Sequence, residues 1–225
     1  MIHNENYLRW RIAVKEPSNQ LLPRSILTTG TPEAPSSLPV EVSLLLPTRK
    51  PETHLPPADV MGASDAAGIF LTNPFLNKTV LTHQLTANSV SWLSNLPAII
   101  QYDDAFVQQL SDVNLGFANE LNTLISLCGT RAKSIVSIGR PEEAVVAAEA
   151  GVDALFVLPP VDHFETGFPS VGMRQEQILK VRKAIPDYQG YVLGLLTDAE
   201  SVHPRTWPAG IDAGVIRPVE VQLVK

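Results

Sequence analysis

The feature that most constrains this sequence is the regular alternation, beginning at Pro39, of short apolar runs with stretches of helical pattern. Each apolar run is bounded by turn residues, and eight such runs follow one another along the chain. The predicted strands are residues 40–46, 67–71, 97–102, 111–115, 133–137, 153–158, 190–195 and 211–216. The predicted helices are residues 89–94, 104–110, 119–127, 141–150 and 173–185.

This alternation predicts an α/β fold with a (β/α)8 barrel of the TIM type. Buried parallel strands read as continuous apolar runs, because helices cover one face and other side chains fill the inside. A doubly wound open sheet also fits the pattern, but no glycine cluster of the dinucleotide-binding kind is present, which favours the closed barrel. Four prolines separate the first two predicted strands, so we expect a short or broken first helix there.

The N-terminal part of the chain has a different character. Residues 16–39 contain five prolines among Ser, Thr, Gly and Gln, which predicts an irregular or extended segment. Residues 8–14 alternate loosely and predict a peripheral strand. We therefore expect an N-terminal extension over residues 1–38 and the barrel over residues 39–225.

Composition and charge exclude several classes of protein. A net charge of −6 without a basic cluster argues against a nucleic-acid partner. The single cysteine, Cys128, forms no internal disulfide and is expected to be a small buried residue. No apolar run reaches the roughly 20 residues that span a membrane, and the first residues lack the pattern of a secretory signal. These observations predict a cytoplasmic protein with no membrane partner.

In such barrels the active site forms from the loops that follow the carboxyl ends of the strands. Asp103 and Asp104 follow the third predicted strand, and with Glu120 after the fourth they could hold Mg²⁺ through carboxylate oxygens. The alternative is that Asp104 caps the helix that begins at residue 105 while Asp103 is solvated.

His163 is the candidate general acid or base. It lies between carboxylates in "DHFETGF", which follows the sixth predicted strand. The alternative is a solvent-facing loop residue. No pair of histidines has zinc-binding spacing, and neither a nucleophile elbow nor a Walker loop is present.

The usual phosphate cradle of a barrel follows strands seven and eight. Here the seventh predicted strand leads into Thr197 and Asp198, with Gly194 as its one glycine. The eighth ends at Arg217, which can supply positive charge in place of glycine N–H groups. We expect Thr197 and Arg217 to contact a phosphate.

The second half of the chain resembles the thiamine phosphate synthase family and its thiazole tautomerase relatives. The resemblance is carried by "SIVSIGRPEEAVVAAEAGVDALFVLPPVDHF", "LKVRKAI", "YVLGLLTDAESV" and "AGIDAGVIRP", and it extends upstream through "PAIIQYDDAFVQQLSDVNLGF". It covers residues 66–217 and implies a barrel that transfers or binds small phosphorylated metabolites with Mg²⁺. Asp103 or Asp104 takes the place of one metal-binding aspartate, Glu120 stands near the other, and Ser137 takes the place of the serine on strand five.

The same comparison shows departures at the phosphate-binding positions. The lysine of the loop after strand six is replaced in "DHFETGF", and the Gln-x-Arg-x-Lys motif of strand two is replaced by "LTNPFLNK". Lys78 is the remaining cation near that motif. We expect Arg49, Lys50, Lys78, Arg140 and Arg217 to supply a rebuilt cationic set.

Three interpretations of function follow. The first is a divergent enzyme of thiamine-type metabolism that binds a small phosphorylated molecule at the barrel mouth, with Ser137 and His163 as catalytic residues. The second is a catalytically inactive barrel that serves as a structural or partner-binding protein. The third is a barrel isomerase or aldolase. A homodimer is expected for each.

Overall fold

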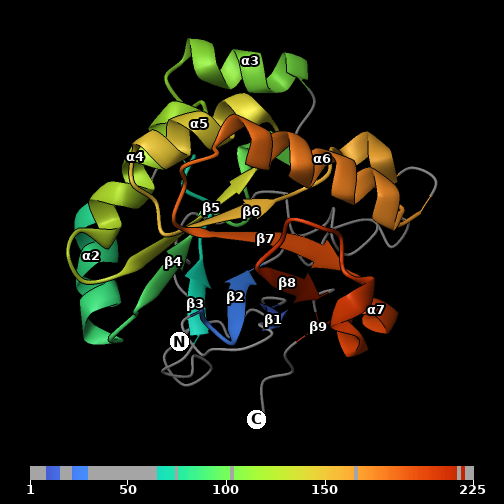
Figure 1. The fold of residues 1–225 in the computed structure, drawn as a ribbon. Helices are drawn as coiled ribbons and strands as arrows, with labels where there is room; N and C mark the ends of the chain where they lie inside the picture. The colour runs from blue at the N-terminus through green and yellow to red at the C-terminus, as the bar shows by residue number, and fades with distance from the viewer. Residues whose placement is uncertain are drawn as a thin grey trace.

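The computed structural model describes residues 9–15, 22–29, 65–73, 76–101, 104–164, 167–216 and 219–220. Their strands form one sheet of order β2-β3-β4-β5-β6-β7-β8-β1-β9, and β1 also pairs with β2 (Figure 1). The strands are β1 (Arg9–Lys15), β2 (Ser25–Thr29), β3 (Asp65–Gly68), β4 (Trp92–Ser94), β5 (Lys133–Ile138), β6 (Ala154–Val157), β7 (Tyr191–Leu196), β8 (Ala213–Ile216) and β9 (Val219–Glu220).

The sheet closes into a barrel through β1. Strands β2 to β8 run parallel in chain order, whereas β1 is antiparallel to both β8 and β2. The eight strands β1 to β8 therefore leave no open edge between β2 and β8. The predicted α/β fold with a TIM-type barrel is confirmed, with one antiparallel strand in an otherwise parallel sheet.

Helices lie outside the sheet (Figure 1). They are α2 (Lys78–Ala87), α3 (Asp104–Asp112), α4 (Phe117–Cys128), α5 (Pro141–Glu149), α6 (Val171–Ala184) and α7 (Asp198–Val202), with short 3-10 turns η1 (Ile99–Gln101), η2 (Val161–Phe164) and η3 (Pro204–Thr206). Side chains of Asn77, Ser170 and Thr197 accept hydrogen bonds from backbone N–H groups in the first turns of α2, α6 and α7. Among the described residues, no helix has the length and apolar character needed to cross a membrane.

Several predicted elements in the first half of the chain are wrong. Residues 89–94, predicted as a helix, contain β4, and the strand predicted at 97–102 contains the turn η1. The strand predicted at 111–115 is the end of α3 and the turn after it. In the run at 97–102, Ala98 and Ile99 are fully buried, but burial alone does not distinguish a strand from a turn. In the run at 111–115, Val113 is 63% exposed, so that apolar pattern did not indicate burial. The strand predicted at 40–46 lies outside the described residues.

Two barrel strands come from the segment that the sequence assigns to an N-terminal extension. Residues 8–14, expected to be a peripheral strand, correspond to β1, which closes the barrel. Within the proline-rich segment 16–39, Ser25–Thr29 forms β2 and pairs in parallel with β3. The sheet thus begins before residue 39.

Two separate groups of apolar side chains fill the structure. The first lies inside the barrel, because nearly all its members come from strands; it includes Ile26, Trp92, Ile135, Phe156 and Leu193. The second lies between the strands and the helices, and it combines strand residues with residues of α2, α4, α5 and α6. Alternation along each strand sends successive side chains to these two cores.

Gly68 marks a close approach inside the barrel. It lies two residues after Ala66, a member of the inner core, so both positions face the lumen. A Cβ atom at Gly68 would lie 2.7 Å from the carbonyl oxygen of Leu96 and 3.0 Å from Cβ of Thr28. A side chain at this position therefore collides with backbone as well as with a neighbouring strand.

We predict that Gly68→Ala lowers the free energy of unfolding by about 1–3 kcal/mol, because the core must shift to admit one methyl group. Urea unfolding measures this change. The matched control is Gly172→Ala in the first turn of α6, where the nearest atom to a Cβ is Ser170 Oγ at 3.9 Å. The control should be neutral or stabilising by up to about 1 kcal/mol. Equal effects of the two substitutions would contradict the close approach.

Candidate functional site at the carboxyl end of the barrel

Two serine hydroxyls in the lumen have no hydrogen-bond partner among the residues that the structure describes. Ser94 on β4 and Ser137 on β5 each lie two residues after a member of the inner core, Trp92 and Ile135, so both point into the barrel. Both residues are fully buried, and neither Oγ atom finds a partner within the described part of the chain. By contrast, Thr28 on β2, also fully buried, donates its hydroxyl to the carbonyl of Leu96 at 2.9 Å.

These two hydroxyls lie towards the carboxyl ends of their strands. Ser94 is the last residue of β4, and Ser137 is the last but one residue of β5. Ser94 pairs with Ile135, so Ser137 lies two residues further along towards the barrel mouth. A buried hydroxyl without a partner costs roughly 1–3 kcal/mol, so such groups are rare in folded proteins. Both hydroxyls can therefore form a hydrogen bond to a further polar group.

Apolar side chains surround this part of the lumen. Phe164 of η2 is only 6% exposed and belongs to the inner core together with Leu96, Leu158 and Leu195. Its ring meets that of Phe168 edge to face, with centroids 6.0 Å apart. Phe164 therefore enters the carboxyl end of the barrel from the loop after β6. The ring of Phe164 thus forms part of the apolar lining at this end of the barrel.

A buried carboxyl lies on the other face of the same strand ends. Asn95 follows Ser94 and extends away from the lumen, where its Nδ2 donates to Oε2 of Glu120 on α4 at 2.9 Å. The hydroxyl of Thr72 donates weakly to Oε1 of Glu120 at 3.4 Å. The Oδ1 atom of Asn95 accepts from the backbone N–H of Ser137 at 2.7 Å. Asn95 thus continues the β4–β5 pairing beyond its last ladder pair.

Burial controls the protonation of Glu120. The residue is fully buried, and desolvation raises the pKa of its carboxyl to about 8. Hydrogen bonds from Asn95, the backbone of Ile99 and Thr72 lower the pKa but offset only part of this effect, and the charge of Glu143 raises it further. Glu120 is therefore mainly protonated at neutral pH. It positions the ends of β4 and β5 through Asn95.

The structure separates the acidic residues predicted to bind Mg²⁺. Asp104 begins α3, is exposed, and forms an ion pair with Arg140. Glu120 is buried in the network described above, and Asp103 lies outside the described residues. Among the described residues, no group of three or more His, Cys, Asp or Glu side chains could hold a metal ion. Asp104 and Glu120 therefore do not form a common site, and Mg²⁺ binding stays a prediction.

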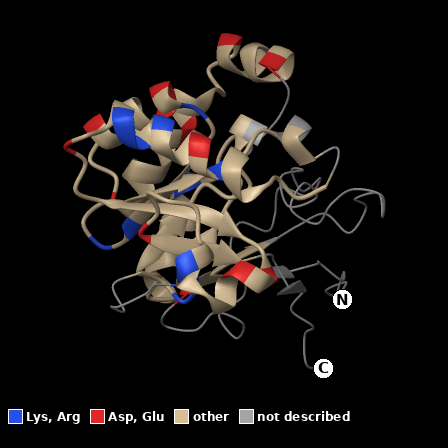
Figure 2. Cartoon of the chain, turned by 45° about the vertical axis from the view of Figure 1, so that its right-hand side comes forward, with Lys and Arg blue, Asp and Glu red and all other residues tan. Residues whose placement is uncertain are grey.

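The cations predicted to bind phosphate have separate partners. Lys78 begins α2 and donates to Oγ1 of Thr123 on α4 at 3.1 Å, whereas Arg140 pairs with Asp104 of α3. Arg49, Lys50 and Arg217 lie outside the described residues. Figure 2 shows the charged residues spread over helices and connecting loops. The described cations of this set therefore do not converge on one place.

The remaining predicted residues have ordinary local environments. The hydroxyl of Thr197 accepts from the backbone N–H of Glu200 at 3.2 Å and caps α7. His163 lies in η2 and is half-buried, next to Phe164. Ser137 is the predicted catalytic residue whose side chain faces the lumen with its hydroxyl unpaired.

Sequence reasoning missed Ser94, Asn95 and Arg174. The first two follow Trp92 in a run that was assigned to a helix and a turn, although polar residues at the end of a buried strand are the pattern expected at a barrel mouth. Arg174 is 2% exposed and donates to the carbonyls of Pro169 and Leu195 and to Glu200. Its partners at positions 195 and 200 lie more than twenty residues away, so no local pattern indicates its role.

A scan against protein-family models finds no match, and no curated protein matches the sequence. Among solved structures, nitroalkane oxidase from Streptomyces ansochromogenes matches with a TM-score of 0.33 and 15% identity over 67% of this chain. The match spans 48% of that chain, so this protein covers about half of the oxidase's length. This is a distant likeness of fold, and the assignment of the barrel rests on the strand pairing itself.

We predict that the stability of the wild type relative to Glu120→Gln depends on pH. The folded state raises the carboxyl pKa from 4.5 to about 8, so the folded protein binds the proton more tightly than the unfolded chain. The stabilisation that comes from binding this proton is complete below pH 4.5 and is lost as the pH rises from 4.5 to 8. Above pH 8 the titration of this group no longer changes the stability. The stability difference between wild type and variant should therefore fall by at most about 5 kcal/mol between pH 5 and 9. Urea unfolding at several pH values measures it, and a difference that is constant across this range would contradict the neutral carboxyl.

Proposed function

We propose that this protein binds a small molecule in the carboxyl half of its barrel lumen, with the hydroxyls of Ser94 and Ser137 as its polar contacts. The observation that carries the proposal is the pair of fully buried, unpartnered Oγ atoms on adjacent strands. A ligand or an ordered water with hydrogen-bonding groups would remove the cost of leaving both atoms unpaired. The position agrees with the general rule that barrels bind their ligands at the carboxyl ends of strands.

The first class of ligand to consider is a phosphorylated metabolite of thiamine-type metabolism, as the family resemblance implies. Ser137 is the residue that the resemblance places on strand five, and hydroxyl groups donate readily to phosphate oxygens. The charge for such a ligand would come from Arg217 or from segments outside the described residues, because Arg140 is paired with Asp104. For a ligand of this class, the proposed reaction is that of a transferase, with Ser137 and His163 as the catalytic residues.

A second candidate is a catalytically inactive barrel that acts as a structural or partner-binding protein. The burial of Phe164 in the inner core, against Phe168, favours this candidate because the ring occupies the mouth through which a substrate would enter. The isomerase or aldolase interpretation has less support. Lys133, the lysine nearest to a Schiff-base position, begins β5 at the opposite end and lies over the ring of Trp92.

We predict that ligand binding and the two lumen hydroxyls are coupled. A thermal-shift screen should contain a compound that raises the melting temperature. The compounds are phosphate, pyrophosphate, thiazole and pyrimidine phosphates, and the uncharged alcohols that correspond to the thiazole and pyrimidine phosphates, each with and without Mg²⁺. A ligand at a hundredfold excess over its Kd stabilises by about 2.7 kcal/mol. Ser137→Ala and Ser94→Ala should abolish most of this shift, while leaving the ligand-free protein as stable as the wild type or slightly more so.

Ser134→Ala is the matched control on the same strand. Its hydroxyl faces away from the lumen and bonds to Asp153 at 3.2 Å, so the substitution should lower stability and leave the ligand shift unchanged. Indifference of the wild type to every compound, with the serine variants also unchanged, would contradict the binding proposal and favour the inactive barrel.

A further inference from the structure

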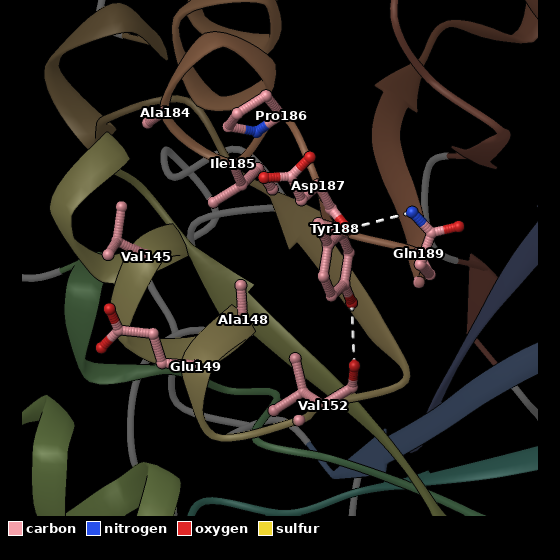
Figure 3. Close-up of a pocket in the computed structure, with 12 residues that line it drawn as sticks. Val145, Ala148, Glu149, Val152, Ala184, Ile185, Pro186, Asp187, Tyr188 and Gln189 are labelled. Carbon is pink, nitrogen blue, oxygen red and sulfur yellow. Dashed lines mark hydrogen bonds between the residues drawn. The ribbon is translucent and has the colours of Figure 1, made fainter.

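A hollow of about 460 Å³ lies at the other end of the molecule from the two serines. It is formed where α5 and α6 end and the chain enters β7, so it belongs to the amino end of the barrel (Figure 3). Its residues come from the last turns of α5, the turn that follows, and residues 184–190. This volume lies within the range of small-ligand sites.

The ring of Tyr188 stands as one wall of this hollow (Figure 3). Its hydroxyl donates to the carbonyl of Val152 at 3.0 Å, and its backbone N–H donates to the carbonyl of Ile185 at 3.2 Å. A Cβ atom at residue 190 would lie 2.3 Å from the phenol oxygen, so Gly190 is the residue that leaves room for this arrangement. The tyrosine is thus held at both ends and presents a fixed aromatic surface.

The charges around the hollow are negative. Glu149 on α5 and Asp187 after α6 are exposed and are the charged residues among those that line the hollow. The C-terminal ends of two helices, which carry partial negative charge, meet at the same place. Burial raises the pKa of Tyr188, the charges of Asp153 and Asp212 raise it further, and the charge of Arg182 lowers it.

Basic residues of the last turn of α6 lie close in sequence to the hollow and do not line it. Among the described residues, the last turn of α5 has no basic residue, and the last turn of α6 has Arg182 and Lys183. Arg182 donates to the carbonyl of Gly210 and pairs with Asp212, and neither basic residue lines the hollow. Most other lining side chains are apolar, including Val145, Ala148 and Ile185.

We propose that this hollow binds a small organic cation, of the alkylammonium or quaternary ammonium class. The apolar floor receives the carbon substituents, the ring of Tyr188 faces the positive charge, and Glu149 and Asp187 attract it. An anion is disfavoured by both carboxylates and by the helix ends. The site is independent of the lumen site, because it lies at the opposite end of the barrel and shares no residue with it.

The experiment compares choline with 3,3-dimethylbutan-1-ol, which has the same shape and no charge. Binding is followed by the amide NMR signals of the full chain, with the amides of Ala148, Gly151 and Gly190 as reporters of the hollow. Choline should give saturable shifts at these amides, and the uncharged alcohol should bind at least about tenfold more weakly because it lacks the charge that the ring and carboxylates attract.

Three variants and one control sharpen the test. Glu149→Gln and Asp187→Asn should each weaken choline binding about threefold, and Tyr188→Leu should weaken it by a similar factor or more. Glu142→Gln, in the first turn of the same helix α5, should leave it unchanged. Melting temperatures establish that each variant is folded.

Equal binding of the alcohol and choline, or no saturable shift at the reporter amides, would overturn the proposal. Reporter shifts that depend on protein concentration without any ligand would also overturn it, since a second copy would then cover the hollow. Because the lumen serines are untouched in these variants, failure here leaves the proposed lumen site standing, and failure of the lumen site leaves this one standing.

Discussion

The antiparallel pairing of β1 with both β8 and β2 is the constraint on which the rest of the structure depends. Five residue pairs join β1 to β2, and the pairs of Val14 with Val215 and Lys15 with Gly214 join it to β8. Without this strand the parallel sheet would have two open edges and its inner face would meet water. Closure turns the inner face of the sheet into a lumen. The side chains of Ser94 and Ser137 are buried for this reason.

The two ends of the barrel differ in their chemistry because they are built from different parts of each strand–helix unit. At the carboxyl end, strand ends and the 3-10 turn η2 place serine hydroxyls among aromatic and aliphatic side chains. The neighbouring network of Glu120 and Asn95 fixes β4 against β5 and faces the helix layer. At the amino end, helix C-termini, two carboxylates and Tyr188 surround an open hollow. One end therefore suits contacts through hydroxyl groups, and the other suits a cation.

Sequence reasoning was most successful where apolar runs and helical stretches alternated without interruption. The strands predicted at 133–137, 153–158, 190–195 and 211–216 are confirmed as β5 to β8, and the intervening helices as α5 and α6. It failed at residues 89–102, because the apolar run of η1 is buried as deeply as a strand and β4 is only three residues long. Individual site residues were partly foreseen: Ser137 faces the lumen as a strand-end residue should, whereas Asp104 and Arg140 pair with each other across 36 positions of sequence.

The sequence by itself determined the class of fold, since the spacing of buried positions along strands and helices is a local property of the chain. Only the tertiary structure decided how the barrel closes, because the pairing of β1 with β8 joins residues some two hundred positions apart. It also decided that Glu120 is a neutral buried group: the pKa of a carboxyl depends on what surrounds it. The placing of Ser94 and Ser137 on adjacent strands, and of Glu149, Asp187 and Tyr188 around one hollow, likewise follows from packing, because each set comes from elements distant in sequence.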